Sequence, residues 1–214
     1  MKTHLDEARR LEAMLEYENT LDREGYRLVG GMDEAGRGPL AGPVVAACVI
    51  MKRDALIEGV NDSKLLTEKK REELYEKIIS SALAHAVAVI GNEDIDSYNI
   101  LQAARMAFVQ AFVKMVVKPD ALLVDAIGSL NIPVKTIQII KGDRKSYNIA
   151  AASIVAKVYR DRLMREYDKT YPCYLFAKHK GYGTEEHMEA IRSHGPCPIH
   201  RRTFIKNIWS GDGL

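Results

Sequence analysis

Two adjacent acids introduce a glycine-rich segment. Asp33 and Glu34 follow a short apolar run at residues 26–30, and residues 31–43 hold four glycines, two prolines and Arg37. Carboxylates at a strand end are costly to bury unless a cation meets them. Glycines let a ligand approach backbone N–H groups, and a guanidinium suits phosphate. The segment indicates either a metal site beside a phosphate-binding loop or a polar turn between two strands.

Two further acids follow predicted strands. Asp125 closes the apolar run 121–124, and Asp143 comes just after a predicted strand at residues 134–140. The order strand, helix, strand predicts a parallel pair, and ligand sites in such sheets gather at the carboxyl ends of the strands. Asp33, Glu34, Asp125 and Asp143 are therefore candidate ligands for Mg²⁺ or Mn²⁺, which prefer carboxylate oxygens. Two such ions can clamp the attacking water and the leaving oxygen in phosphodiester hydrolysis.

Strand geometry restricts the first two acids. Neighbouring residues of a regular strand point to opposite faces of the sheet. Asp33 and Glu34 can share one site only if the strand ends or bulges between them, and the nearby glycines allow this.

The basic residues gather toward the C-terminus. Residues 1–140 hold 17 Lys/Arg and 21 Asp/Glu, a net charge of −4, whereas residues 141–214 hold 14 and 8, a net charge of +6. Residues 178–184 place Lys178, His179 and Lys180 beside Tyr182. Cations next to an exposed ring suit the phosphates and bases of a nucleic acid, although a solvated face is the ordinary alternative.

Lys64 and a group of sulfur and imidazole side chains offer two weaker indications. Lys64 precedes a predicted helix whose N-terminus can bind phosphate, but the preferred interpretation from its local sequence is a solvated turn lysine. Zinc is the rival metal, because potential zinc ligands are dense in the tail. These ligands do not form the paired short-spaced knuckles of structural zinc sites. They are Cys173, His179, His187, His194, Cys197 and His200.

Bulk properties indicate a soluble globular protein with one large domain, or one domain with a small appendage. The chain has 214 residues, of which 47% are hydrophobic and 28% charged, ordinary values for a globular protein. No apolar run is long enough to span a bilayer, and the charged N-terminus is unlike a signal peptide. Three cysteines predict reduced thiols in the cytoplasm, with a Cys173–Cys197 bridge as the alternative.

Periodicity and capping predict the supporting elements. We expect helices at 4–21, 68–81, 98–117, 150–168 and 185–193, and strands at 26–33, 44–51, 84–90, 121–124 and 134–140. The first two strands should form an antiparallel pair. Thr67 should cap the second helix, and Asp94 and Asp96 are interpreted as first-turn acids of the third.

Six blocks together resemble bacterial ribonuclease HII, of the type 2 ribonuclease H family. The match runs in order from about residue 26 to residue 204. The blocks are Asp33-Glu34-Ala35-Gly36-Arg37-Gly38-Pro39, Asp62-Ser63-Lys64, Val124-Asp125, Lys141-Gly142-Asp143, residues 151–157 (AASIVAK) and residues 179–184 (HKGYGT).

The resemblance implies an α/β, RNase H-like fold, with a mixed central sheet flanked by helices and a small C-terminal helical portion. It divides the chain into an N-terminal helical appendage (1–25), a catalytic domain (26–170) and a basic helical portion completing the substrate cleft (171–214). The implied activity is endonucleolytic cleavage of RNA in RNA–DNA hybrids and 5′ of single ribonucleotides embedded in duplex DNA. Such cleavage leaves 3′-hydroxyl and 5′-phosphate ends. We expect a cytoplasmic monomer.

The resemblance also implies roles for individual residues. The four acids take the family's metal-binding positions. Gly36, Arg37 and Gly38 take the loop that reads the ribose 2′-hydroxyl, the group that separates RNA from DNA. Tyr182 takes the tyrosine that packs on the following deoxyribose, and Lys64 takes a phosphate-contacting position.

Two alternatives belong to other classes. A non-catalytic nucleic-acid binding module would use the basic tail and Tyr182 alone, but it would gain nothing from acids where phosphates dock. A metal phosphatase acting on small molecules would leave the basic tail unexplained.

Overall fold

A mixed β-sheet forms the centre of the computed structural model, which describes residues 4–54 and 56–209. The strand order is β3-β2-β1-β4-β5. β2 is antiparallel to β1 and β3, whereas β4 is parallel to β1 and β5. The predicted hairpin is therefore confirmed. The strand ending at Asp125 is parallel to its neighbours, as predicted, but these neighbours are β1 and β5, not the strand that precedes it in the sequence. The strands are β1 (Val29–Ala35), β2 (Val44–Met51), β3 (Ala82–Ile90), β4 (Ala121–Asp125) and β5 (Lys135–Ile139).

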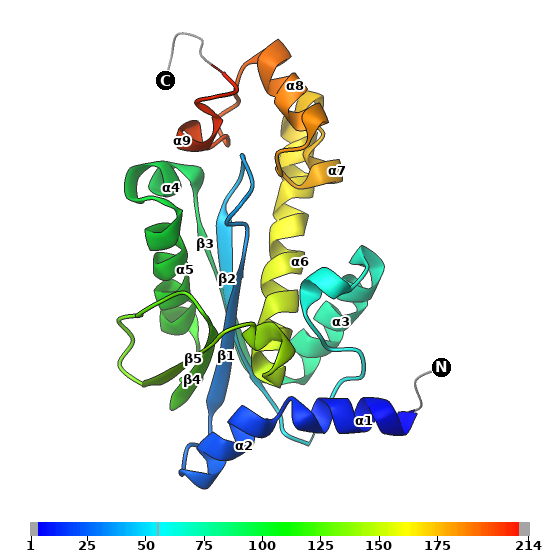
Figure 1. Cartoon of the computed structure of the whole chain (residues 1–214), viewed down its shortest axis with the longest axis vertical. Coiled ribbons are helices and arrows are strands. Elements are labelled where there is room, and N and C mark those ends of the chain that lie inside the picture. Colours follow the sequence, from blue (N-terminus) through cyan, green and yellow to red (C-terminus); the bar gives the residue numbers. More distant parts are fainter. Residues whose placement is uncertain (1–3, 55, 210–214) are drawn as a thin grey trace.

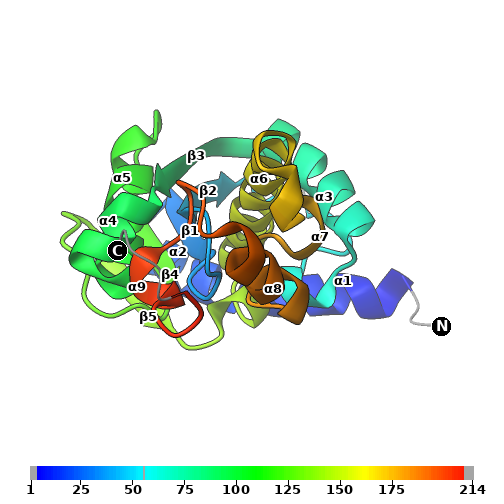
Figure 2. The same cartoon turned by 90° about the horizontal axis from the view of Figure 1, so that it is seen from above.

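Helices cover both faces of the sheet. α4 (Asn92–Tyr98) and α5 (Ile100–Lys114) lie on one face, and α3 (Glu68–Ser81) and α6 (Tyr147–Thr170) lie on the other (Figures 1 and 2). β2 is buried throughout, because its alternate side chains enter two different cores. Cys48 packs with the core under α5, and Val49 packs with the core under α6. The α/β fold class is confirmed.

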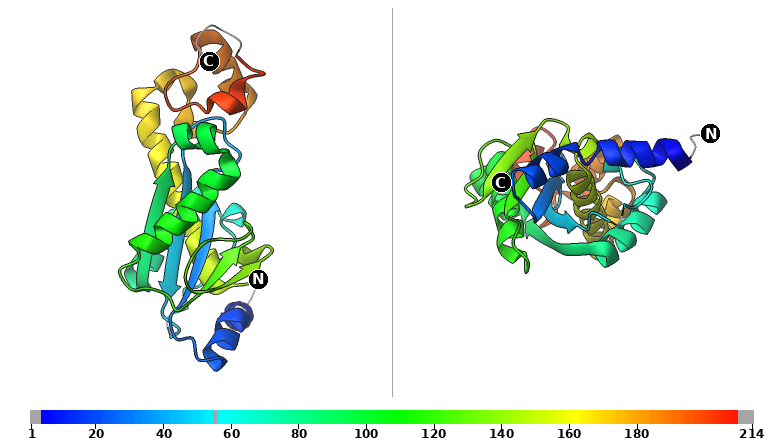
Figure 3. Two further views of the ribbon diagram at one scale, coloured as in Figure 1. Left: turned by 90° about the vertical axis from the view of Figure 1, so that its left-hand side faces the viewer. Right: turned by 90° about the horizontal axis from the view of Figure 1, so that it is seen from below.

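The two ends of the sheet carry smaller helices. α7 (Phe176–His179), α8 (Glu185–His194) and α9 (Arg202–Ile205) lie at one end, and α1 (His4–Ala13) and α2 (Glu16–Arg23) lie at the other (Figure 3). Short 3₁₀ helices occupy Ser63–Leu65, Gly142–Arg144 and Pro172–Tyr174. Within the described ranges, no helix combines the length and apolar character needed to cross a membrane.

Two predicted helices are each divided in the structure. The helix expected at 4–21 breaks at Met14 and Leu15, so that α1 and α2 pack into different cores. Leu11 joins the core under α6, whereas Leu21 packs with β1 and β4. The helix expected at 98–117 starts only after Asn99, which has a φ of 70° and accepts hydrogen bonds from two amides of α5.

This break also changes the interpretation of two acids. Asp94 lies in the first turn of the separate helix α4. Asp96 instead accepts hydrogen bonds from the backbone N–H groups of Arg202 (2.7 Å) and Thr203 (2.9 Å), so it caps α9 from across the sequence. Its interpretation as a first-turn acid was wrong, because tertiary packing supplied a second helix end. The three cysteines are free, which confirms the prediction of unpaired thiols.

The N-terminal segment caps α6. The first three amides of this helix would otherwise lack partners. Tyr147 N–H donates to the Met14 carbonyl (3.0 Å), Asn148 N–H to Glu18 Oε1 (3.0 Å), and Ile149 N–H to Ser146 Oγ (3.2 Å). Two of these acceptors come from residues 1–25. The division of the chain after residue 25 stays a prediction, but this segment supports the longest helix of the catalytic unit.

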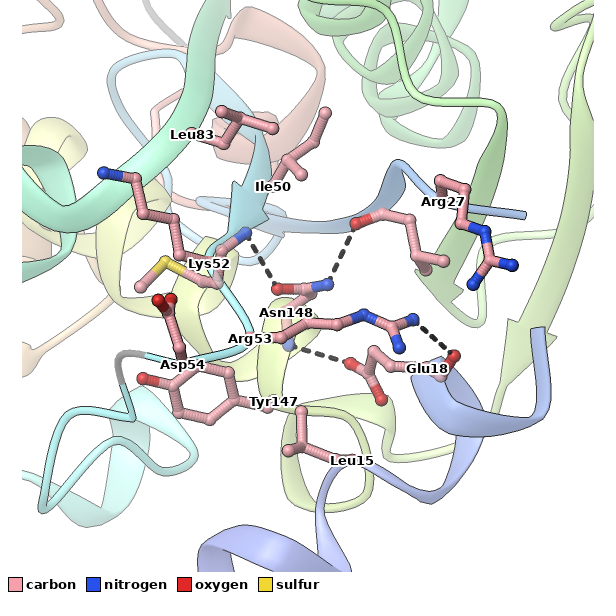
Figure 4. Close-up of a pocket in the computed structure, with 12 residues that line it drawn as sticks. Leu15, Glu18, Arg27, Ile50, Lys52, Arg53, Asp54, Leu83, Tyr147 and Asn148 are labelled. Carbon is pink, nitrogen blue, oxygen red and sulfur yellow. Dashed lines mark hydrogen bonds between the residues drawn. The ribbon is translucent and has the colours of Figure 1, made fainter. Parts of the chain in front are cut away.

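Glu18 lies deep in the contact between α2 and α6 (Figure 4). Only 2% of the residue is exposed, and its Oε1 also accepts a hydrogen bond from Ser146 Oγ (2.6 Å). Burial raises the pKa of Glu18, while the hydrogen bonds from Ser146 and Asn148 oppose that rise. Two buried donors, Ser146 Oγ and Asn148 N–H, therefore share one carboxylate oxygen of Glu18.

Glu18→Ala should lower the free energy of unfolding by about 1–3 kcal/mol, because two buried donors would lose their acceptor. Glu18→Gln keeps an acceptor oxygen and should lose clearly less. Urea unfolding at neutral pH measures both variants against the unmodified protein. Equal stability of the alanine variant and the unmodified protein would contradict this role.

Candidate active site

Three of the four predicted acids meet at one end of the central strands. Oxygen atoms of Asp33, Asp125 and Asp143 all lie within 4.8 Å of one another. Met32 pairs with Val124, so Asp33 and Asp125 are the next residues on two parallel neighbours and share a face of the sheet. Asp143 joins them because the N–H of Gly142 donates to Asp125 Oδ1 (2.9 Å), which holds the turn after β5 in place.

Glu34 lies beside this group but is not part of it. β1 continues through Ala35, and its register with β2 is unbroken at Asp33 and Glu34. The two side chains therefore leave opposite faces of the strand. Glu34 Oε1 instead lies 3.4 Å from Arg37 Nη1. Burial raises the pKa of Glu34, Arg37 opposes this rise, and the charge of Asp125 adds to it. The Glu34 carboxylate is therefore close enough to interact electrostatically with the three-acid group.

The three converging acids repel one another in a buried setting. Burial, followed by the charges of Glu34 and Asp125, holds the pKa of Asp33 well above its usual range. Burial, followed by the charges of Asp62 and Asp125, raises the pKa of Asp143 to about 6. A divalent cation would remove this repulsion, and three carboxylates are the donor set of a hard ion. The residues therefore fit Mg²⁺ or Mn²⁺.

The tail gives no support to zinc. His187 Nε2 lies 3.1 Å from His200 Nε2, and Cys197 N–H donates to His200 Nδ1 (2.9 Å). These ring nitrogens serve hydrogen bonds within a buried cluster, and burial lowers the pKa of each of the two histidines to about 4. Over residues 4–54 and 56–209, the three-acid group is the one that can hold a metal.

The predicted substrate-binding residues line one cleft of about 530 Å³ beside the acids. All five predicted positions contribute to its wall, together with Asp33 and Glu34. They are Gly36, Arg37, Gly38, Lys64 and Tyr182. Gly36 has a φ of +102°, and a Cβ there would lie 2.2 Å from Arg160 Nε, so no other residue fits this turn.

Lys64 and Tyr182 border the acids from two sides. Lys64 Nζ lies 4.0 Å from Asp143 Oδ2 on a side chain that is 78% exposed. Burial would lower the pKa of Lys64, but Asp33 and Asp143 outweigh it and the pKa is raised. Tyr182 is 41% exposed, and Lys157 Nζ lies 5.8 Å from the centre of its ring. An accessible cation and an accessible ring therefore face the same cleft.

Sequence reasoning missed four polar residues that build this site. Asp62 accepts hydrogen bonds from Lys64 N–H (2.9 Å) and Arg144 Nη2 (3.0 Å), and so holds two cations near Asp143. Ser153 Oγ donates to Ser63 Oγ (2.8 Å), which ties α6 to the Lys64 turn. Lys157 lines the cleft one turn further along α6. Polar residues four apart in an otherwise apolar stretch of helix were the available signal for Ser153 and Lys157.

A mixed sheet with converging carboxylates and an adjacent basic cleft defines a metal-dependent nuclease of the RNase H-like fold. The ribonuclease H2 from Pyrococcus horikoshii OT3 matches this structure with a TM-score of 0.71 and 30% identity, over 85% of this chain and 97% of that one. Bst-RNase HIII in complex with Mn²⁺ shares the fold, with a TM-score of 0.61 and 20% identity over 80% of this chain and 64% of that one.

Sequence comparisons identify the family. The model of the family described as Ribonuclease HII matches residues 30–210. The Ribonuclease HII of Caldanaerobacter subterraneus subsp. tengcongensis is 52% identical over 205 residues, which cover 96% of this chain and 85% of that protein. The chain belongs to the ribonuclease HII family, which confirms the resemblance seen in the six sequence blocks. It is thus a ribonuclease H, an enzyme that acts on RNA–DNA hybrids.

The raised pKa of Asp143 predicts a pH-dependent loss of folding stability in the metal-free enzyme. The pKa of Asp143 in the folded protein, about 6, exceeds the ordinary value of 3.8. Between these two pH values the folded protein therefore keeps a proton on Asp143 that the unfolded chain has released. This carboxyl should therefore reduce stability as the pH rises from about 4 to about 6, and by a constant amount above that. Asp143→Asn should gain stability relative to the unmodified protein over the same interval.

Thermal unfolding in chelator, from about pH 4 to about pH 8, measures this difference. The comparison must be made between the two proteins at each pH, because the lowered pKa values of His187 and His200 give both proteins an opposite trend. Added Mn²⁺ should raise the unfolding temperature of the unmodified protein more than that of the variant. A difference between the proteins that does not change with pH would contradict the assignment.

Proposed function

We propose that this ribonuclease H is an endonuclease that cuts the RNA strand of RNA–DNA hybrids and nicks duplex DNA 5′ of a single embedded ribonucleotide. The products carry 3′-hydroxyl and 5′-phosphate ends. The observation that carries the proposal is the convergence of Asp33, Asp125 and Asp143 beside a cleft lined by Gly36–Gly38 residues and Tyr182. The cleft has the acids at one side and, at the other, the loop of residues 36–43, here called the reading loop. This arrangement suits a cut placed at a fixed position relative to one nucleotide.

Two Mg²⁺ or Mn²⁺ ions, when bound, supply an activated water and stabilise the departing 3′-oxygen. Asp33, Asp125 and Asp143 would hold these ions, and we assign Glu34 to the same site because the charge of Asp125 raises the pKa of its carboxyl group. The raised pKa values of Asp33 and Asp143 support this role, since a bound cation would offset both their burial and the repulsion that each receives from Asp125. The Mn²⁺ complex of the more distant Bst-RNase HIII supports the choice of metal.

The loop and Tyr182 position the substrate. Backbone N–H groups of Arg37 and Gly38 donate to the 2′-oxygen of the ribonucleotide, which deoxyribose lacks. The exposed ring of Tyr182 packs against the following deoxyribose, and a Cβ on Gly38 would lie 4.0 Å from that ring, so both sugars are read at one place. Lys64 contacts a backbone phosphate close to the acids.

We also propose that the enzyme acts as a monomer in the cytoplasm. Three free cysteines suit a reducing compartment.

A non-catalytic binding module is the rival proposal. It would place cations, not three converging acids, where phosphates dock, and its affinity would not depend on divalent ions. Incubation with a duplex carrying one ribonucleotide separates the two proposals. A cut that appears with Mg²⁺ or Mn²⁺ and disappears with chelator supports the nuclease, and uncut substrate under all conditions refutes it.

Asp33→Asn and Asp125→Asn should each abolish cleavage by at least about a thousandfold, because each removes a charged ligand from the metal site. Both variants should still bind an RNA–DNA hybrid, since the cleft surface is unchanged. Single-turnover cleavage and fluorescence anisotropy measure the two properties. Glu12→Gln, an exposed acid in α1, serves as the matched control and should remain active. Full activity of either aspartate variant would refute the assigned roles.

Tyr182→Ala should slow cleavage at an isolated ribonucleotide by about tenfold or more, because the sugar loses its packing surface. Tyr182→Phe keeps the ring and should stay within about threefold of the unmodified rate. Mn²⁺ binding, measured by calorimetry, should be the same in both variants because Tyr182 is not one of the proposed metal ligands. An unchanged rate for the alanine variant would remove Tyr182 from the site.

A further inference from the structure

Two buried arginines hold the reading loop from behind. Arg201 donates through Nη2 to the Gly36 carbonyl (2.6 Å), through Nη1 to the Arg37 carbonyl (3.0 Å) and through Nε to the Gly42 carbonyl (3.0 Å). Both Arg160 and Arg201 are fully buried. Within the described part of the chain, neither forms an ion pair with a carboxylate. A buried cation without a counterion is costly, so its hydrogen bonds to the loop must matter to the fold.

The two arginines act on different parts of the loop. Arg160 donates to the carbonyls of Ala41 (3.1 Å) and Pro43 (2.9 Å), near the start of β2, and to that of Lys180 (3.0 Å). Of the two arginines, only Arg201 donates hydrogen bonds to the carbonyls of Gly36 and Arg37. The guanidinium fork suits this task, because its parallel donors match two successive carbonyls.

The orientation of these carbonyls fixes the orientation of two amides. In a trans peptide, the C=O of one residue and the N–H of the next point in opposite directions. Because Arg201 draws the carbonyls of Gly36 and Arg37 inward, the N–H groups of Arg37 and Gly38 point away from it, toward the cleft that these residues line. Among residues 4–54 and 56–209, no protein acceptor occupies either amide. Two adjacent free donors therefore face the substrate.

Arg201 is itself held firmly in place. Its N–H donates to the Leu40 carbonyl (2.9 Å), so it is bonded to the loop through its backbone as well. The next two residues donate to Asp96, which caps α9. Burial, followed by the nearby charge of Arg160, lowers the pKa of Arg201 to about 9, which leaves it charged at neutral pH. A fixed positive charge behind the loop also strengthens the two amides as donors.

We propose that Arg201 is a positioning residue for ribose recognition, because its guanidinium aims the N–H groups of Arg37 and Gly38 at the 2′-oxygen of the substrate. This inference rests on the proposed function of the loop. The preference of the loop for ribose over deoxyribose then depends on a residue outside the loop. Arg201 lies 163 positions after Gly38 in the 214-residue chain.

Arg201→Lys tests the proposal, because lysine keeps the charge but loses the two-pronged donor. The probes are two duplexes of one sequence, with either a single ribonucleotide or its deoxy counterpart at the same place. Fluorescence anisotropy without divalent ions measures the ratio of their dissociation constants. The variant should lower the preference for the ribonucleotide by about tenfold, as expected for one or two weakened hydrogen bonds, and should bind the all-DNA duplex as before.

Arg160→Lys is the matched control, an equally buried arginine that packs against Gly36 but donates its hydrogen bonds to the carbonyls of Ala41, Pro43 and Lys180 instead of those of Gly36 and Arg37. Arg160→Lys should weaken the binding of both duplexes by the same factor, so that the ratio of their dissociation constants stays unchanged. In cleavage at the ribonucleotide, Arg201→Lys should raise KM more than it lowers kcat, because the acids are untouched. The proposal would be overturned if Arg201→Lys kept the ratio of dissociation constants of the unmodified protein. It would also be overturned if both variants lost the preference for the ribonucleotide to the same extent.

Amide resonances of the unmodified protein give a second measurement that does not depend on a variant folding. The ribonucleotide duplex should shift the ¹⁵N–¹H signals of Arg37 and Gly38, and the all-DNA duplex should leave them within a small fraction of that change. Equal shifts with both duplexes would overturn the role of these amides. If the unmodified enzyme fails to cut at the ribonucleotide with Mg²⁺ or Mn²⁺, the proposed function fails and this inference fails with it.

Discussion

The close approach of helix α6 to strand β1 is the constraint on which the rest of the structure depends. A Cβ on Gly31 would lie 2.1 Å from the backbone carbonyl carbon of Asn148, so the helix and strand are in direct backbone contact there. Asp33 lies two residues further along the same face of β1, which brings it under Ser153 of α6. Asp143 lies just before the same helix. The position of α6 therefore sets the distance between the acids, and residues 1–25 stabilise its N-terminus.

This arrangement concentrates negative charge where the protein provides little to neutralise it. Asp33 and Asp143 are both buried, and burial together with neighbouring carboxylates raises their pKa values. The nearby cations offset this charge only in part, since Arg144 pairs with Asp62 and the exposed Lys64 lies 4.0 Å from Asp143. The large apolar cores on both sides of the sheet supply the stability that offsets this repulsion. A site that is strained without a cation is well suited to bind one.

The reading loop is rigid for the opposite electrostatic reason. Arg160 and Arg201 are cations buried among carbonyl oxygens, so the loop carbonyls must stay turned inward to solvate them. The same contacts join the loop to the C-terminal helices, because Leu40 N–H donates to the Gly181 carbonyl (2.8 Å) and Arg201 precedes α9. The C-terminal portion thereby fixes both Tyr182 and the loop amides. Acids, ring and amides are held by one connected framework.

The sequence by itself determined the fold class, the family and part of the cleft lining, whereas Ser63, Ser153 and Lys157 were added by the structure. Apolar runs, caps and glycine positions are local signals, which is why β2, α3 and the turn after β1 could be predicted from them. Local signals could not show that Asn99 divides one predicted helix or that β1 runs past Glu34, because those outcomes follow from long-range packing. Tertiary structure alone decided that three acids converge while Glu34 faces Arg37, and that Asp96 caps a distant helix. It alone also paired Arg201 with Gly36, since no local pattern tells a buried arginine from a solvated one when its partners are backbone carbonyls 165 residues away.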